Sequence, residues 1–281
     1  MKTFGRLAAL LLVFAAAPSF AAITCTVAVP TPITVVYDPT VNADNVTTGR
    51  YTITCNRLAT DASSIAWSLA ANNGQHNGGG SNRAQSAGGQ RYSYDLYLPP
   101  YTNGIKWQGG NVFTGTLNFG ASLTASVTGT FDIWVFKQQP VQPASTYTDQ
   151  IAVTLKNTAN NNTLDTSTFL MNIVTTNACQ LAVPPGDINL NYTANQVAAA
   201  TANTSFGVRC TTALPYTMAL DATSGTIVSL NYTLALSQAS ATGSGLVQTY
   251  SVNGSIAGGQ AGKCATATCS GSQTRTLTIT Y

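Results

Sequence analysis

The sequence predicts an all-β protein of two β-sandwich domains, and three observations lead to that fold class. Thr, Val and Tyr, which favour strands, are abundant, while Gly and Asn mark frequent turns. No long stretch has apolar residues at the i, i+3, i+4, i+7 spacing of an amphipathic helix. Similar short motifs recur in the same order in both halves of the chain. Many short strands separated by turns are typical of immunoglobulin-like sandwiches.

Residues 1–21 have the features of a secretory signal peptide. Lys2 and Arg6 precede the short apolar run "LAALLLVFAAA", and "SFA" supplies small residues for cleavage after Ala21. No later run approaches the roughly 20 apolar residues of a membrane-spanning helix. We therefore expect a secreted chain that begins at Ala22.

The charge of the chain argues against several functions. Charged residues make up 7% of the sequence, against roughly 25% in an average soluble domain. Without Lys2 and Arg6 the 12 basic residues fall to 10, against 9 Asp and no Glu. Such a nearly neutral surface predicts no nucleic-acid partner. With His76 as the one histidine, we expect neither an enzyme nor a cofactor or metal site.

The internal repeat predicts an N-terminal domain at residues 22–176 and a C-terminal domain at residues 177–281. Three pairs of segments carry the repeat: "AITCTVAV" (22–29) and "NACQLAV" (177–183), "PITVVYDP" (32–39) and "GDINLNYT" (186–193), and "RYTITCNR" (50–57) and "TSFGVRCTT" (204–212). Each copy would form one sandwich of short strands.

Six cysteines in a secreted chain favour disulfides. The matching positions in the two copies, about 30 residues apart, predict the pairs Cys25–Cys55 and Cys179–Cys210. Cys264–Cys269 would close a local loop, and a zinc site there lacks the four ligands it needs.

The two copies differ at their ends. "TYTDQIAVTL" (146–155) corresponds to "TRTLTITY" (274–281), but in the first copy a polar turn and another strand, "TFLMNIVTT" (168–176), follow. The sequence stops at Tyr281, so we expect the C-terminal sandwich to lack its final strand. Its apolar interior would then need a strand from another chain. The alternative is that residues 275–281 form an ordinary edge strand of a complete sandwich.

Four longer segments resemble the spore coat protein U family: "RAQSAGGQRYSYDLYLPPYTNGIKWQGG" (83–110), "FDIWVFKQQPVQPASTYTDQIAVTL" (131–155), "CTTALPYTMAL" (210–220) and "GGQAGKCATATCSGSQTRTLTITY" (258–281). With the repeats above they cover nearly all of the mature chain. Two departures occur: Gln108 separates Trp107 from Gly109, and the C-terminal copy has no tryptophan.

The resemblance implies a role in assembly, because this family includes subunits of archaic, Csu-type chaperone–usher pili. A periplasmic chaperone would lend the missing strand, and a neighbouring pilin would replace it at an outer-membrane usher. The docking edge would carry Leu277, Ile279 and Tyr281. Two-domain members look like pilus-tip adhesins of the cell surface, which act in surface attachment and biofilm formation. Ala22 lies only three positions before Cys25, so we also expect no N-terminal strand to donate.

The best candidate for adhesion is the loop "LPPYTNGIKW" (98–107), where Pro-Pro and Asn-Gly predict a turn. Its candidate contact residues are Leu98, Pro99, Pro100, Tyr101, Ile105 and Trp107. An exposed apolar tip would suit an abiotic or host surface with little charge. The alternative is that Tyr101 and Trp107 turn inward and pack against the core.

Two other functions stay open. A secreted carbohydrate-binding sandwich could use Trp67, Trp107 and Trp134 as an aromatic platform. A structural pilin of the shaft is the second possibility, although the expected lack of an N-terminal donor strand argues against it.

Overall fold

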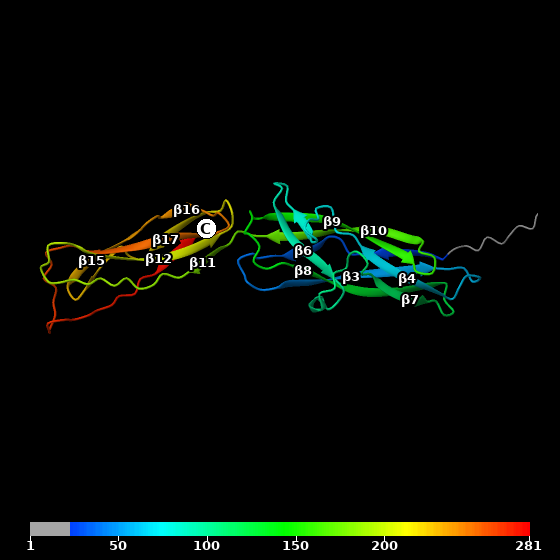
Figure 1. Ribbon diagram of the computed structural model, residues 1–281, viewed down its shortest axis with the longest axis horizontal. Helices are drawn as coiled ribbons and strands as arrows, with labels where there is room; N and C mark the ends of the chain where they lie inside the picture. Colours follow the sequence, from blue (N-terminus) through cyan, green and yellow to red (C-terminus); the bar gives the residue numbers. More distant parts are fainter. Residues whose placement is uncertain (1–22) are drawn as a thin grey trace, which may run out of the picture.

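A computed structural model describes residues 23–281, so the expected signal peptide at residues 1–21 lies outside the described residues. The strands fall into two groups that share no hydrogen-bonded ladder. We call residues 23–176 the N-lobe and residues 177–281 the C-lobe. Figure 1 shows the lobes end to end, the N-lobe in blue to green and the C-lobe in yellow to red. None of the described residues forms a helix able to cross a membrane.

The N-lobe contains ten strands. They are β1 (Thr24–Ala28), β2 (Ile33–Val36), β3 (Asn45–Asn56), β4 (Ser64–Ala71), β5 (Asn82–Gln85), β6 (Arg91–Tyr97), β7 (Phe113–Asn118), β8 (Thr124–Val135), β9 (Ser145–Asn157) and β10 (Thr163–Thr175), with a 3-10 turn, η1 (Tyr101–Asn103), after β6. They form one continuous sheet in the order β1-β3-β8-β6-β5-β9-β10-β2, and β4 pairs with β7 and β9. A single residue pair, Gln85↔Thr148, joins β5 to β9. The sheet curls there into two layers around one core.

Strand β10 completes the N-lobe from within the same chain. It pairs antiparallel with β9 on one side and parallel with β2 on the other. Its alternating residues Phe169, Met171 and Ile173 are at most 1% exposed. Alternation of this kind places every second side chain of a strand in the core. The N-lobe therefore contains its own final strand, as the sequence predicts.

The C-lobe contains eight strands in two sheets. They are β11 (Cys179–Val183), β12 (Ala200–Cys210), β13 (Pro215–Leu220), β14 (Ser224–Ile227), β15 (Leu230–Leu236), β16 (Ser240–Thr242), β17 (Val247–Ile256) and β18 (Leu277–Thr280). One sheet has the order β11-β12-β17-β15-β14 and the other the order β16-β13-β18. Phe206, Val208, Met218 and Val252 belong to the core between the two sheets.

Three disulfides connect the cysteine pairs expected from the sequence. Cys25–Cys55 joins β1 to β3, and Cys179–Cys210 joins β11 to β12. In each case the two cysteines face each other directly in the ladder. Cys264–Cys269 closes a short exposed loop that precedes β18. The two longer crosslinks thus sit at matching places in the two lobes.

Candidate strand-acceptor site and surface loops

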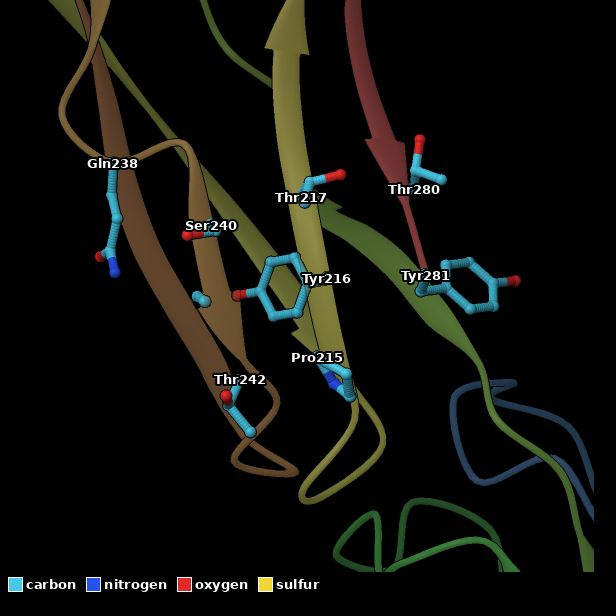
Figure 2. Close-up of a pocket in the computed structure, with 9 residues that line it drawn as sticks. Pro215, Tyr216, Thr217, Gln238, Ser240, Thr242, Thr280 and Tyr281 are labelled. Atoms are coloured by element: carbon cyan, nitrogen blue, oxygen red, sulfur yellow. The ribbon is translucent and has the colours of Figure 1, made fainter.

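One edge of β18 has no partner within residues 23–281. Strand β13 pairs with the other edge, from Leu220↔Leu277 to Thr217↔Thr280. Figure 2 shows β13 between β16 and β18, with the Tyr281 side chain directed away from β13. The N–H and C=O groups along such an edge are available to another strand.

A second segment beside the C-lobe core also lacks a ladder. Residues 187–192 belong to no strand and make no backbone–backbone hydrogen bond within the described chain. Ile188 and Leu190 nevertheless pack over Gly254 of β17. The corresponding stretch of the N-lobe contains β2, whose ladder partner is β10. We call the free edge of β18 together with residues 187–192 the acceptor edge.

The exposed fractions of matching side chains show how much apolar surface the C-lobe leaves uncovered. Ile151 and Val153 of β9, covered by β10, are 0% exposed. Their counterparts in β18, Leu277 and Ile279, are only half-buried, although they also pack against the core. Tyr281 is 59% exposed. The acceptor edge therefore leaves apolar side chains partly in water at the position that β10 covers in the N-lobe.

A hollow of about 680 Å³ lies beside the end of β18, and Figure 2 shows the side chains around it. Its lining includes Tyr216, Thr217, Ser240, Thr280 and Tyr281, and no side chain of Asp, Glu, His or Cys. Burial raises the pKa of the Tyr216 hydroxyl, which lies 2.6 Å from the hydroxyl of Tyr250. Tyr216 therefore stays protonated at neutral pH, and the hollow lacks a group for acid–base chemistry.

The loop 98–107 is divided between core and surface. Pro99 and Pro100 are exposed, and Ile105 is 43% exposed. Leu98 packs against the N-lobe core. Tyr101 is half-buried, with its ring 6.1 Å from that of Trp134. Only part of the expected apolar tip thus faces solvent.

Trp107 is a correction to the expected contact residues, because it is 1% exposed. Its indole N–H donates a hydrogen bond of 3.0 Å to the carbonyl of Leu69. Its ring lies 5.0 Å from those of Phe113 and Phe131. A large aromatic side chain with a satisfied N–H is stable in a core, so Trp107 supports the loop from below and does not reach a surface.

The aromatic platform of the alternative sugar-binding function is contradicted for two of its three tryptophans, Trp67 and Trp107. Trp67 is 4% exposed and lies in the same core as Trp107. Trp134 is half-buried on the outer face of β8, beside Tyr97 and Phe136. The three tryptophans therefore do not form one exposed surface.

Two buried carboxylates hold loops of the N-lobe in place. Asp95 is 1% exposed, forms an ion pair with Lys106 and accepts a hydrogen bond from Ser81. Asp149 is 2% exposed and accepts hydrogen bonds from the Tyr94 hydroxyl and from a backbone N–H of the β4–β5 loop. Burial raises the pKa of both carboxyls. Both carboxyls thus connect loops to strands of the N-lobe.

The loops at the end of the N-lobe away from the C-lobe, the right-hand end in Figure 1, were not predicted from the sequence as a site. The loops 57–63, 119–123 and 158–162 meet there, and Leu58 and Leu123 are 54% and 50% exposed. Each loop has ordinary turn residues, so only the strand topology brings the three together.

Comparison with known proteins gives a family match. A model of the Spore Coat Protein U domain matches residues 11–154. No curated protein matches the chain. Among solved structures, the CupB6 tip adhesin from Pseudomonas aeruginosa has 12% identity and a TM-score of 0.33, over 54% of this chain and 44% of that one.

Two further solved structures are similarly distant. A PapD-like domain of human CEP192 has 10% identity and a TM-score of 0.29, over 62% of this chain and 98% of that one. CfaE, the adhesive subunit of CFA/I fimbria of enterotoxigenic Escherichia coli, has 11% identity and a TM-score of 0.30, over 52% and 46%. Likenesses of this size carry no inference about function.

Proposed function

The chain belongs to the Spore Coat Protein U domain family, and on that premise we propose that it is the tip adhesin of a chaperone–usher pilus. In this proposal the C-lobe is a pilin domain completed by a strand from another chain. The N-lobe is an adhesive domain that mediates surface attachment and biofilm formation. The protein would pass through the periplasm to the cell surface, with a chaperone, an outer-membrane usher and a neighbouring pilin as partners.

The acceptor edge is the observation that carries the proposal. Two backbone segments beside the C-lobe core, the outer edge of β18 and residues 187–192, have no ladder partner within residues 23–281. The half-buried side chains of Leu277, Ile279 and Ile188 lie against one core. A single added strand could pair with both segments and cover all three side chains, as β10 does in the N-lobe.

The energy of this completion is large for a domain of this size. A strand that buries four or five apolar side chains contributes roughly 6–15 kcal/mol, at about 1.5–3 kcal/mol for each. The free energy of unfolding of a whole domain is about 5–15 kcal/mol. An uncompleted C-lobe should therefore be marginally stable, which explains why a chaperone would be needed before a pilin takes its place.

The direction of the added strand supports a position at the pilus tip. Strand β10 runs antiparallel to β9 and parallel to β2. Strand β18 points toward the N-lobe, with the C-terminus beside the junction of the lobes (Figure 1). A strand antiparallel to β18 would run away from the N-lobe, so its C-terminal end would lie at the end of the C-lobe farthest from the N-lobe. The body of the donating subunit would then lie there, and the N-lobe would be free to meet a surface.

For attachment we propose the solvent-facing part of loop 98–107. Pro99, Pro100 and Ile105 present apolar groups to solvent. The buried side chain of Trp107 anchors the end of the loop in the core. A stiff apolar loop loses little conformational entropy on contact. It would suit an abiotic or host surface of low charge.

The decisive experiment grafts residues 156–176, the β9–β10 turn with β10, after Tyr281. The graft can form a hairpin on the acceptor edge in the orientation seen in the N-lobe. We expect a higher soluble yield and a melting temperature raised by about 10 °C or more. A gain of about 1 kcal/mol in the free energy of unfolding raises the melting temperature of a 100-residue domain by about 4–8 °C. The matched control carries Ser in place of the grafted Phe169, Met171 and Ile173. Equal melting temperatures for the parent, graft and control would contradict the proposal.

A further inference from the structure

A hollow of about 790 Å³ lies at the end of the N-lobe away from the C-lobe. Its walls come from the β3–β4 loop, the β9–β10 loop and the start of β1. This end is the part of the N-lobe farthest from the acceptor edge (Figure 1). A hollow at this end stays accessible to a ligand when the acceptor edge of the C-lobe is occupied by another subunit.

The loops around the hollow are held in one shape by Arg57. Its guanidinium donates hydrogen bonds to the carbonyls of Asp61 (3.1 Å), Gly120 (3.1 Å) and Ser122 (3.2 Å). It also lies over the ring of Phe119. These contacts connect the β3–β4 loop to the β7–β8 loop, so the first wall is preorganised, which lowers the entropy lost on binding.

The opposite wall presents amide groups. The side-chain oxygens of Asn157 and Asn160 accept the backbone N–H groups of Ala159 (2.9 Å) and Asn162 (3.0 Å). These bonds fix both amides and leave their NH₂ groups without a partner in the described chain. The Asn162 side chain makes no hydrogen bond to residues 23–281. Each free amide can donate to or accept from a hydroxyl.

The side chains of the lining disfavour anions. No Lys or Arg lines the hollow, and Asp61 is its one charged residue. One oxygen of Asp61 accepts the N–H of Leu58 (2.6 Å), and the other has no donor among residues 23–281. Lys156, at the base of the β9–β10 loop, bonds to Asn161, outside the lining.

Apolar side chains complete the lining. Ile23, Ile65 and Leu164 belong to or pack against the N-lobe core and also line the hollow. Thr60, Ser64 and Thr163 add hydroxyls around them. Apolar surface combined with a few directed polar groups is the usual composition of a small-molecule site.

We propose that this hollow binds a neutral carbohydrate. A sugar ring has apolar C–H faces, which fit the side chains of Ile23, Ile65 and Leu164. Its ring hydroxyls can pair with the free amides of Asn160 and Asn162 and with the free oxygen of Asp61. The lack of a cation disfavours sialylated, sulfated or uronic-acid glycans. This inference rests on the proposed attachment role of the N-lobe, and not on completion of the C-lobe.

The test measures binding of the full secreted chain, residues 22–281, to an array of neutral and acidic glycans. Ala159→Trp fills the hollow from an exposed wall position, and Asn162→Ala removes an amide that makes no intramolecular bond. Asn203→Ala, at an exposed position of β12 in the C-lobe, is the matched control. We expect neutral glycans to bind, Ala159→Trp to reduce binding about tenfold or more, and Asn203→Ala to have no effect. Asn162→Ala should weaken binding several-fold, with melting temperatures unchanged throughout.

Three results would overturn the inference: no neutral glycan is bound, acidic glycans bind equally well, or Ala159→Trp binds like the parent. The same preparations are assayed for binding of a fluorescent peptide of residues 163–176 to the acceptor edge. Peptide binding without glycan binding rejects the sugar site alone. Glycan binding without peptide binding rejects the proposed assembly and leaves the site in place.

Discussion

Arg209 of the C-lobe donates a hydrogen bond of 3.2 Å from its guanidinium to the backbone carbonyl of Gln139 in the N-lobe. Gln139 is itself fixed, because its side chain bonds to both backbone groups of Ser93. Beside this contact the Thr212 hydroxyl donates to the carbonyl of Val141, which is 2% exposed. Hydrogen bonds from Arg209 and Thr212 therefore connect the two lobes around the buried Val141; we call these contacts the joint.

We predict that Arg209→Ala loosens this joint. The variant removes a charge-assisted hydrogen bond, worth about 1.5–3 kcal/mol, and also the bond from Arg209 to Gly245. Small-angle scattering should show a broader distribution of lobe orientations. Arg91→Ala, which removes only a contact within the N-lobe, is the matched control. An unchanged distribution in Arg209→Ala would show that other contacts hold the lobes.

The N-lobe should become less stable as the pH rises from 4. Burial raises the pKa of Asp149 and of Asp95 above the ordinary value of about 3.9. The folded state then binds protons more tightly than the unfolded state does. The contribution to the unfolding free energy is therefore complete below about pH 4 and is lost as the pH passes the raised pKa.

Denaturant unfolding of the full chain at a series of pH values measures this dependence. Asp149→Asn should flatten the slope, because the amide does not titrate. Asp187→Asn, at an exposed position of the C-lobe, serves as the comparison. A slope of opposite sign, or one that Asp149→Asn does not change, would contradict the assignment.

Trp107→Ala should destabilise the N-lobe by about 3–5 kcal/mol, as expected for removing a large core aromatic. The change also leaves the Leu69 carbonyl without its hydrogen bond. Chemical unfolding of the purified chain gives the value. A loss below about 0.5 kcal/mol, typical of a surface position, would mean that the indole is not part of the core.

Replacing Ile105 with Asn should reduce attachment to polystyrene while leaving the unfolding free energy within about 0.5 kcal/mol of the parent. Ile105 is 43% exposed, so the substitution changes the surface and hardly affects the core. Thr102→Asn, in the exposed turn of the same loop, controls for the chemistry of the introduced amide. If cells with Ile105→Asn attach as well as the parent, this loop is not the contact.

Replacing both Cys179 and Cys210 with Ala should cost the C-lobe about 3–4 kcal/mol. The crosslink spans 31 positions, and the chain-entropy model assigns about that value to such a loop. Thermal unfolding of the lobe would report the loss. A melting temperature equal to that of the parent would show that the ladder between β11 and β12 suffices without the crosslink.

The repeat in the sequence made the disulfide pairs predictable. Residues 168–176 follow the turn after β9, and no such segment follows β18 within the described residues, so comparing the ends of the two copies predicted the difference between the lobes. Cysteines at matching positions indicated Cys25–Cys55 and Cys179–Cys210. These features depend on local pattern, which sequence carries directly.

Other features depend on how distant segments meet. Pro-Pro and Asn-Gly in loop 98–107 predicted a turn, but not that Trp107 would reach the Leu69 carbonyl. The single pair Gln85↔Thr148, which makes the N-lobe sheet continuous, leaves no pattern in either strand. The bond between Arg209 and Gln139 crosses the lobes, so neither residue alone indicates it.

The position of one disulfide has a mechanical consequence. The connection from the N-lobe enters the C-lobe at Cys179, the first residue of β11, and Cys179 is bonded to Cys210 on the neighbouring strand. When the molecule is pulled lengthwise, the load passes into two covalently joined strands at once. The disulfide prevents β11 from separating from β12 one hydrogen bond at a time. Tension is therefore transmitted to the sandwich before the ladder at its edge is broken.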